Sequence, residues 1–219
     1  MSRPEVSVVT GAFGFTGASI ARKLVDMGHQ VRTLTNRNPV GHPLAGVVRT
    51  FPIDFQRPDQ LTVAFDGAST LYNTYWIRFP RGTLTFDKAV ENIRILVRAA
   101  EQAGVSRVVH ISVSNASLNS PLPYFRGKGQ AEEIIRGSQM SYAILRPTLI
   151  FGAGDILLNN IAWFLRKFPV FPIPGKGDYP VQPIHIEDVA SQAGAAARDS
   201  VNLVSESAGP DILSYRDMV

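Results

Sequence analysis

Tyr124 and Lys128 are the two residues of this chain whose types and spacing best suit acid–base chemistry. A separation of four residues places both side chains on one face of a helix. A tyrosine with the ordinary pKa of about 10 exchanges protons poorly at neutral pH, but a nearby ammonium group and the positive end of a helix stabilise phenolate and lower that pKa. The pair is therefore a candidate general acid or base.

A glycine-rich turn near the N-terminus has the residue types that hold a phosphate. The sequence Thr-Gly-Ala-Phe-Gly-Phe-Thr-Gly at residues 10–17 follows an apolar run and precedes an amphipathic stretch, which predicts a strand, a turn and a helix. Gly11 allows a tight turn, Gly14 has no side chain to keep a pyrophosphate off the backbone, and Gly17 lets the helix pack close to the strand. The helix N-terminus attracts the phosphate. We expect a bound dinucleotide, and an ordinary structural turn is the alternative.

Residues at the ends of the next two strands bear on which dinucleotide binds. Asn36 and Arg37 stand where an NAD site would place a carboxylate for the ribose 2'-hydroxyl, and they suit a 2'-phosphate instead. NADP is therefore the predicted cofactor, with NAD the second choice; the alternative for Arg37 is a solvated loop residue. Asp54 could accept a hydrogen bond from the adenine amino group or could serve as a carboxylate at a helix N-terminus.

The elements that must position these residues follow a regular βα pattern. We expect strands at residues 6–9, 31–35, 47–51, 70–72, 108–112 and 142–145, and helices at 18–27, 58–65, 86–103 and 125–136. Parallel strands joined by right-handed helical crossovers form a doubly wound sheet, so the predicted fold is α/β of the Rossmann type. Residues 1–150 would form the NAD(P)-binding domain. Residues 151–219 would form a small substrate lobe that also contributes to the sheet edge, with a helix from Glu187 and a strand at 201–205.

The end of the chain predicts the start of one more helix. Ser214 is a suitable N-cap and Asp217 an acidic residue three positions later, yet the sequence ends at Val219. We therefore expect the substrate lobe to be truncated.

Composition excludes several classes of protein. The chain has 219 residues, is 45% hydrophobic and contains no cysteine, which excludes disulfides, thiolate metal sites and cysteine nucleophiles. We expect no metal site. No secretory segment and no long apolar run is present, so a cytoplasmic protein without membrane contact is expected. The net charge is +4, and the basic residues that produce it are scattered along the chain. This distribution indicates a solvated surface and not a nucleic-acid site.

Several motifs together resemble one known family. They are TGxxGxxG at residues 10–17, Asp54, Asn92 in the long helix, His-Ile-Ser at 110–112, YxxxK at 124–128, Leu-Arg-Pro-Thr at 145–148, and the segment 181–190. This set resembles the short-chain dehydrogenase/reductase superfamily, in its extended and atypical branch of epimerase/dehydratase-like and NmrA-like proteins. The resemblance extends over nearly the whole chain.

The resemblance implies roles for individual residues. Tyr124 would be the catalytic acid/base, Lys128 would bind the nicotinamide ribose, and a serine after the fifth strand would orient the substrate carbonyl. Val113 stands at the usual place of that serine, so Ser112, Ser114 or neither would act. The implied cofactor-binding residues are Gly11, Phe13, Gly14, Phe15, Thr16, Gly17, Asn36, Arg37, Asp54, Phe55, Asn73, Thr74, Lys128 and Pro147, and the implied substrate residues are Tyr75, Trp76 and Thr148.

The end of the fourth strand departs from the family pattern. Aromatic residues, including Tyr75 and Trp76, replace the small residues commonly found beside the cofactor. They would shape an apolar substrate pocket or pack in the core. This local pattern is more similar to the subgroup that includes NmrA-like regulators and an accessory subunit of respiratory complex I, several of which retain the cofactor without demonstrated turnover.

Two functions therefore stand. The first is an NADP-dependent oxidoreductase, or an enzyme of epimerase or dehydratase chemistry, acting on a small molecule. The second is a catalytically silent sensor or scaffold protein that keeps the fold and the cofactor. In the superfamily, helices that resemble 86–103 and 125–136 often form a dimer interface, so a homodimer is one arrangement; burial of the same apolar faces within the subunit is the other.

Overall fold

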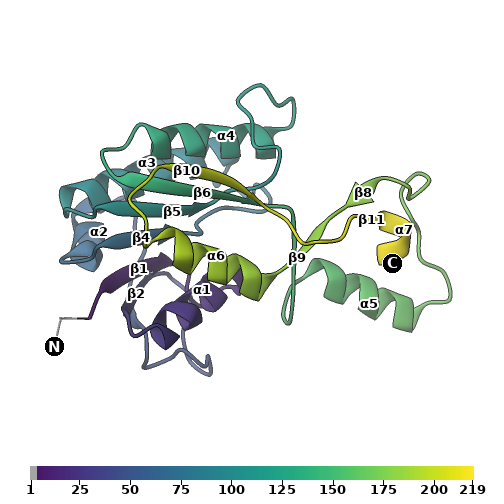
Figure 1. The fold of residues 1–219 in the computed structure, drawn as a ribbon, viewed down its shortest axis with the longest axis horizontal. Coiled ribbons are helices and arrows are strands. Elements are labelled where there is room, and N and C mark those ends of the chain that lie inside the picture. Colours follow the sequence, from purple (N-terminus) through teal and green to yellow (C-terminus); the bar gives the residue numbers. More distant parts are fainter. Residues whose placement is uncertain (1–3) are drawn as a thin grey trace.

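The computed structural model of the chain describes residues 4–219 and is built on one central sheet (Figure 1). Its seven strands are parallel and lie in the order β10-β6-β5-β4-β1-β2-β3. Strand order reverses between β1 and β4, which is where doubly wound sheets bind their ligands. The strands are β1 Val6–Thr10, β2 Gln30–Leu34, β3 Arg49–Phe51, β4 Thr70–Asn73, β5 Arg107–Ile111, β6 Ser141–Pro147 and β10 Leu203–Ser207.

Helices cover both faces of the sheet, and each face has its own hydrophobic core. The helices α1 Phe15–Asp26 and α6 Ile186–Ala196 pack side by side on one face; the helices α2 Pro58–Phe65, α3 Phe86–Gln102 and α4 Pro123–Arg136 cover the other. Because successive side chains of a strand point to opposite faces, Val8 joins one core and Val9 the other. The predicted Rossmann-type fold is confirmed.

The apolar faces of α3 and α4 are used within the subunit. Ile93 and Leu96 of α3 and Ala131 and Ile135 of α4 are fully buried in the core that both helices share with the sheet. A homodimer through these helices therefore stays a prediction.

The chain beyond β6 forms a smaller lobe and then returns to the sheet. Figure 1 shows α5, β8, β11 and α7 standing apart from the sheet, while α6 and β10 rejoin it. The elements of the lobe are β7 Leu149–Phe151, α5 Leu157–Lys167, β8 Pro180–Val181, β9 Pro183–His185, β11 Leu213–Ser214 and α7 Tyr215–Met218, with β7 paired to β9 and β8 to β11. The sequence pattern missed β7, α5, β8, β9 and β11.

The predicted helix start near the end of the chain is confirmed. Ser214 is the N-cap of α7, and its side chain and that of Asp217 form a capping box.

Candidate functional site

The glycine turn has the geometry that was expected of it. Gly11 has a φ of 68°, a left-handed conformation that favours glycine. A Cβ atom on Gly17 would run into the carbonyl group of Gly11, so α1 can pack this close to the turn only with glycine there. Gly14 has an extended conformation and caps α1 without a side chain, which leaves the first N–H groups of the helix open. These features fit a pyrophosphate lying over the turn.

A cavity of about 460 Å³ runs along this turn and the end of β2. Its lining includes Gly11, residues 14–17, residues 34–37 and Thr74. Asn36 pairs with the backbone of Ile53, donating to its carbonyl oxygen (2.8 Å) and accepting from its N–H (3.1 Å). Arg37 donates from Nη1 to the carbonyl oxygen of Phe13 at 2.6 Å. Arg37 is thereby held at the edge of the cavity.

Several residues expected at the cofactor are absent from the lining of this cavity. Phe13 and Asn73 are buried side chains, 3% and 0% exposed. The Asn73 amide oxygen accepts from the backbone N–H of Tyr75 (3.0 Å), and its nitrogen lies 3.1 Å from Nδ1 of the buried His110. Asp54 accepts from the backbone N–H of Gln56 and from Arg57, the N-cap residue of α2, while the acidic residue of the first turn is Asp59.

Thr74 joins the end of β4 to the end of β1 through two hydrogen bonds. Its backbone N–H donates to the Thr10 hydroxyl oxygen at 2.7 Å, and its own hydroxyl donates to the Thr10 carbonyl oxygen. This double contact fixes the wall of the cavity at the point where strand order reverses.

A larger cavity of about 690 Å³ continues from the first and brings the predicted catalytic residues together. Both cavities are lined by Phe15, Thr16, Arg37, Thr74, Trp76 and Arg78. The larger one adds Ser112, Tyr124, Lys128, Pro147 and Thr148, and on the lobe side Asp155, Ile156 and Leu157. The groove over the glycine turn therefore leads directly to Tyr124 and Lys128.

Lys128 is buried, with only 4% of its surface exposed. Its Nζ donates to the carbonyl oxygen of Ile111 at 3.0 Å and lies 4.9 Å from the centre of the Trp76 ring. Burial lowers the pKa of Lys128 to about 7, against the opposing effect of the negative charge of Glu132.

Tyr124 differs from the sequence-based expectation. Its ring meets Trp76 and Phe86 edge to face, with centres 6.1 and 5.8 Å away. Burial raises the pKa of Tyr124, and the charge that opposes this effect is that of Arg78. The expectation that the pKa of Tyr124 is lowered was therefore wrong, because desolvation of the phenol outweighs the positive charge of Arg78. Tyr124 is a neutral phenol at neutral pH.

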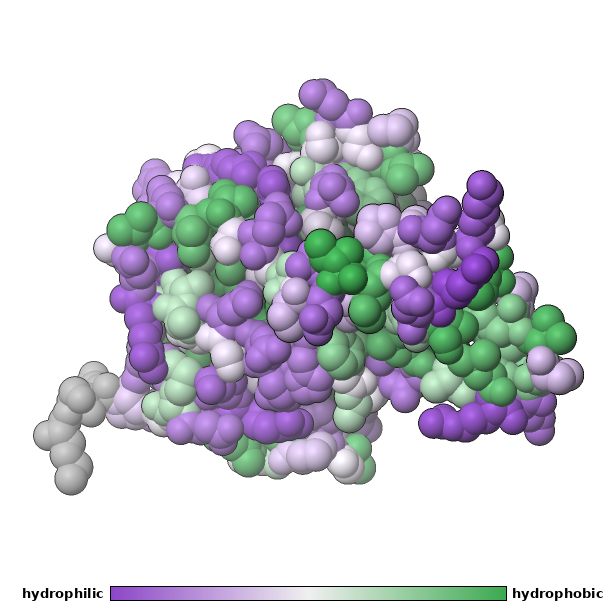
Figure 2. All heavy atoms as spheres, turned by 45° about the vertical axis from the view of Figure 1, so that its right-hand side comes forward, coloured by the Kyte–Doolittle hydropathy of each residue, from purple (hydrophilic) through white to green (hydrophobic). Residues whose placement is uncertain are grey.

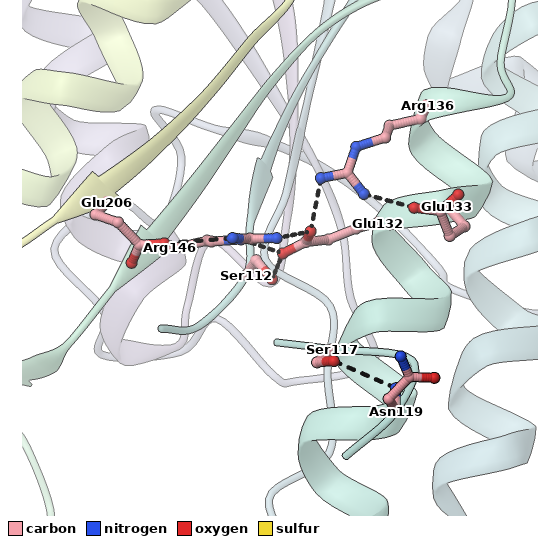
Figure 3. Close-up of polar contacts among 8 residues, drawn as sticks. All are labelled: Ser112, Ser117, Asn119, Glu132, Glu133, Arg136, Arg146 and Glu206. Atoms are coloured by element: carbon pink, nitrogen blue, oxygen red, sulfur yellow. Dashed lines mark hydrogen bonds and ion pairs between the residues drawn. The ribbon is translucent and has the colours of Figure 1, made fainter. Parts of the chain in front are cut away.

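Ser112, and not Ser114, lines the cavity with Tyr124 and Lys128. The Ser112 hydroxyl donates to Oε1 of Glu132 at 2.6 Å, as Figure 3 shows. The backbone N–H of Ser114 instead donates to the carbonyl oxygen of Pro147. Val113, which stands between the two serines in the sequence, also lines the cavity.

The aromatic residues after β4 take both expected roles, because they line the cavities and also pack against neighbouring side chains. Trp76 lines both cavities and stacks on Phe86. Tyr75 lines the first cavity while its hydroxyl accepts from Asn92 at 2.8 Å. Thr148 faces the larger cavity and donates its hydroxyl to the carbonyl oxygen of Gln182.

Glu132, Arg146 and Arg78 are residues of the site that sequence reasoning missed. Glu132 was within reach of a spacing argument, because it follows Lys128 by four residues and must share its helix face. Arg146 stands in the Leu-Arg-Pro-Thr motif, but nothing in the sequence pairs it with Glu132, and Arg78 carries no signal at all, since only the folded chain brings these arginines to Glu132 and to Tyr124.

The family model described as NAD(P)H-binding matches residues 11–153, which is more than half of the chain. The chain belongs to this NAD(P)H-binding family. Its similarity to the extended and atypical short-chain dehydrogenase/reductases is confirmed. Within residues 4–219, the structure contains no helix long and apolar enough to cross a membrane.

Curated relatives of this NAD(P)H-binding protein are similar over most of the chain. Subunit 9 of the NADH dehydrogenase [ubiquinone] 1 alpha subcomplex, mitochondrial, from Arabidopsis thaliana is 28% identical over 97% of this chain and 56% of its own length. A ceramide reductase from Caulobacter vibrioides is 29% identical over 90% of this chain and 62% of its own. The chain thus spans about half to three fifths of the length of these relatives.

Solved structures agree with the fold. MoeE5 in complex with UDP-glucose and NAD has a TM-score of 0.81 and 25% identity, covering 98% of this chain and 79% of that one. UDP-N-acetylglucosamine 4-epimerase from Bacillus cereus, at 16% identity, has a TM-score of 0.81, covers 98% of this chain and 79% of that one, and is similar in fold alone.

Proposed function

We propose that this chain is an NADP-dependent oxidoreductase that reduces the carbonyl group of a small molecule. The observation that carries the proposal is the continuity of two cavities, one over the glycine turn and one containing Tyr124, Lys128 and Ser112. A dinucleotide in the first would place its reactive end in the second.

The chain's own residues supply the proton and the orientation. When bound, the reduced cofactor provides a hydride for the carbonyl carbon. Tyr124 would give its phenolic proton to the carbonyl oxygen, and burial, which raises its pKa, keeps that proton on the phenol at neutral pH until the carbonyl compound binds. Lys128 donates one hydrogen bond to Ile111, and in its charged form its remaining ammonium protons would be available to the nicotinamide ribose.

The preference for NADP is part of the proposal and rests on Arg37. Its guanidinium lies at the edge of the cavity, held by one contact to Phe13, and can meet a 2'-phosphate with charge-assisted hydrogen bonds. We also propose a cytoplasmic location and a homodimer, although the names of several relatives place those proteins in mitochondria.

Replacement of the phenol tests the proposal. Tyr124→Phe keeps the ring against Trp76 and Phe86 and removes only the hydroxyl, so NADPH affinity should hold while turnover falls by about 10²- to 10⁴-fold. NADPH oxidation is followed at the nicotinamide absorbance band with a panel of ketones and aldehydes. A variant that turns over as fast as wild type would remove Tyr124 from the reaction.

A second candidate is a sensor that binds the cofactor without turnover. It is favoured by the serines, because the Ser112 hydroxyl is committed to Glu132 and Ser114 lies outside the cavity lining. Tight NADPH binding with no reduction of any carbonyl compound in the panel would support this function over the first.

A further inference from the structure

Two side chains of α4 hold the end of β5 at adjacent residues. Lys128 donates to the carbonyl oxygen of Ile111 at 3.0 Å, and Glu132 accepts the hydroxyl proton of Ser112 at 2.6 Å. Lys128 and Glu132 are four residues apart, so both contacts come from one face of the helix. One face of α4 therefore contacts Ile111 through Lys128 and Ser112 through Glu132.

Glu132 is a buried carboxylate with more than one cationic partner. Its side chain is 1% exposed. Arg146 donates to it from Nε at 2.9 Å and from Nη2 at 2.7 Å, and Arg136 donates from Nη2 at 3.0 Å (Figure 3). Burial by itself would raise the pKa of Glu132, but the hydrogen bonds from Arg146 and Ser112 and the charges of both arginines outweigh it and hold the pKa below its ordinary value. Glu132 is therefore ionised at neutral pH.

An ionised carboxylate determines which way the Ser112 hydroxyl points. A carboxylate only accepts hydrogen bonds, so the single proton of Ser112 is directed at Glu132. The lone pairs of the Ser112 oxygen can still accept a hydrogen bond, and Ser112 is one of the residues that line the larger cavity. Ser112 is then an acceptor toward a ligand, whereas the neutral Tyr124 is a donor.

The negative charge of Glu132 also bears on Lys128. Burial favours the neutral amine of Lys128, and Glu132 is the group that favours its charged form. The other groups facing this lysine are Tyr124 on its own helix, the Trp76 ring, and His110 on β5, whose pKa burial and the Lys128 charge depress well below the ordinary value. Of the groups named here, Glu132 is the one that carries a negative charge.

We propose that Glu132 is a positioning residue that fixes Ser112 as a hydrogen-bond acceptor and favours the charged form of the Lys128 amine, and that the site takes carbonyl compounds with a hydroxyl or N–H group on the neighbouring carbon. Tyr124 donates to the carbonyl oxygen, and the neighbouring donor group meets Ser112. The substrate part rests on the proposed function; the effect on Lys128 does not.

The charge of Lys128 can be followed directly by NMR. The chain has five lysines, which makes the side-chain carbon signals of ¹³C-labelled lysine simple to assign with Lys128→Met. In the wild type the Lys128 signal should titrate at about pH 7, and in Glu132→Gln its midpoint should move to lower pH. The matched control is Glu133→Gln, which removes a 53% exposed carboxylate that pairs with the same Arg136 and should leave the midpoint in place. An unchanged midpoint in Glu132→Gln overturns the inference.

The wild type keeps the inference testable if Glu132→Gln does not fold. Coupling between two titrating groups is reciprocal, so the side-chain carboxyl ¹³C signal of Glu132 should show a step at the pH where Lys128 loses its proton. A flat signal through pH 7 overturns the positioning role. Arg136 and Arg146 are 29% and 23% exposed and keep Glu133 and Glu206 as partners, so the single variant is expected to fold.

A matched pair of ketones tests the substrate part. 2-Hydroxycyclohexanone carries a donor next to the carbonyl group, and 2-methoxycyclohexanone does not. With NADPH, kcat/KM should be at least about tenfold higher for the hydroxy compound, and Ser112→Ala should reduce that ratio. Equal rates, the reverse preference, or reduction of neither compound removes the substrate part, while the lysine titration still decides the role of Glu132.

Discussion

The two tryptophans of the chain lie in regions that differ in how they are held. Trp76, next to the sheet, stacks on Phe86, meets the Tyr124 ring and lies under the Lys128 amine. Trp163 on α5 of the lobe is 56% exposed, and Ile161 is the one buried residue of that helix. Figure 2 shows apolar side chains gathered on the lobe side of the molecule. The half that would hold the cofactor is fixed by packing on both faces, whereas the half that would select a substrate is not.

The largest expected difference between the two halves is in the free energy of unfolding, which should depend on pH through the buried Lys128. The pKa of Lys128 is about 7 in the fold and 10.5 without burial, so between these values the unfolded chain binds the extra proton. The free energy of unfolding should therefore rise with pH across that window, by about 1.4 kcal/mol per pH unit from this group. Lys128→Met should remove this slope in urea unfolding, and the exposed Lys167→Met in the lobe should keep it. Parallel slopes in all three proteins would contradict the burial of Lys128.

Core truncation should affect the sheet strongly. Leu71 of β4 is fully buried in the core with α2, α3 and α4. Leu71→Ala should lower the free energy of unfolding by about 2 to 5 kcal/mol because it removes packed methyl groups and leaves a cavity. Chemical denaturation measures this loss, and a loss under about 1 kcal/mol would mean that the core is not close-packed there.

Charge reversal at Arg37 should change nucleotide preference without changing the fold. Arg37→Asp removes a charge-assisted contact of about 1.5 to 3 kcal/mol to the 2'-phosphate and adds repulsion, so NADH should bind more tightly than NADPH to the variant. Calorimetric titration of both nucleotides against both proteins decides the order. Equal affinities of the wild type for NADPH and NADH would refute the role of Arg37.

The smallest effect is expected in the lobe. Trp163→Ser replaces a residue that is 56% exposed, so the free energy of unfolding should change by no more than about 0.5 kcal/mol. NADPH affinity should not change at all. A loss comparable to that of Leu71→Ala would show that α5 is held as firmly as the sheet.

The sequence predicts the sheet and its helices better than it predicts the lobe. The strands, the helices of the sheet and the roles of Gly11 and Gly17 follow from local patterns, because periodicity and backbone freedom depend on near neighbours. The lobe strands β7 and β8 are short and pair with partners far along the chain, so no local pattern indicates them.

Within the site, sequence spacing brought Tyr124 and Lys128 together correctly but did not predict their electrostatics. The pKa of Tyr124 is raised by burial, and burial is a property of the folded chain that spacing does not contain. The commitment of Ser112 to Glu132 is likewise a contact between α4 and the end of β5 that only the fold creates.

Trp76 is placed to report directly whether a nicotinamide dinucleotide binds over the glycine turn with its reactive end near Tyr124. Trp163→Phe leaves Trp76 as the single tryptophan, and it lines both cavities. Titration of this variant with NADPH should quench the Trp76 emission to saturation. The same titration after adding Gly14→Val should give no quenching, because the new side chain fills the space of the pyrophosphate. The φ of −102° is open to valine, but its Cβ would lie 3.3 Å from the Gly11 carbonyl oxygen, so circular dichroism is used to check that the variant is folded. NADPH binding that leaves the Trp76 emission unchanged, or that survives Gly14→Val, would mean that the dinucleotide does not lie over the glycine turn.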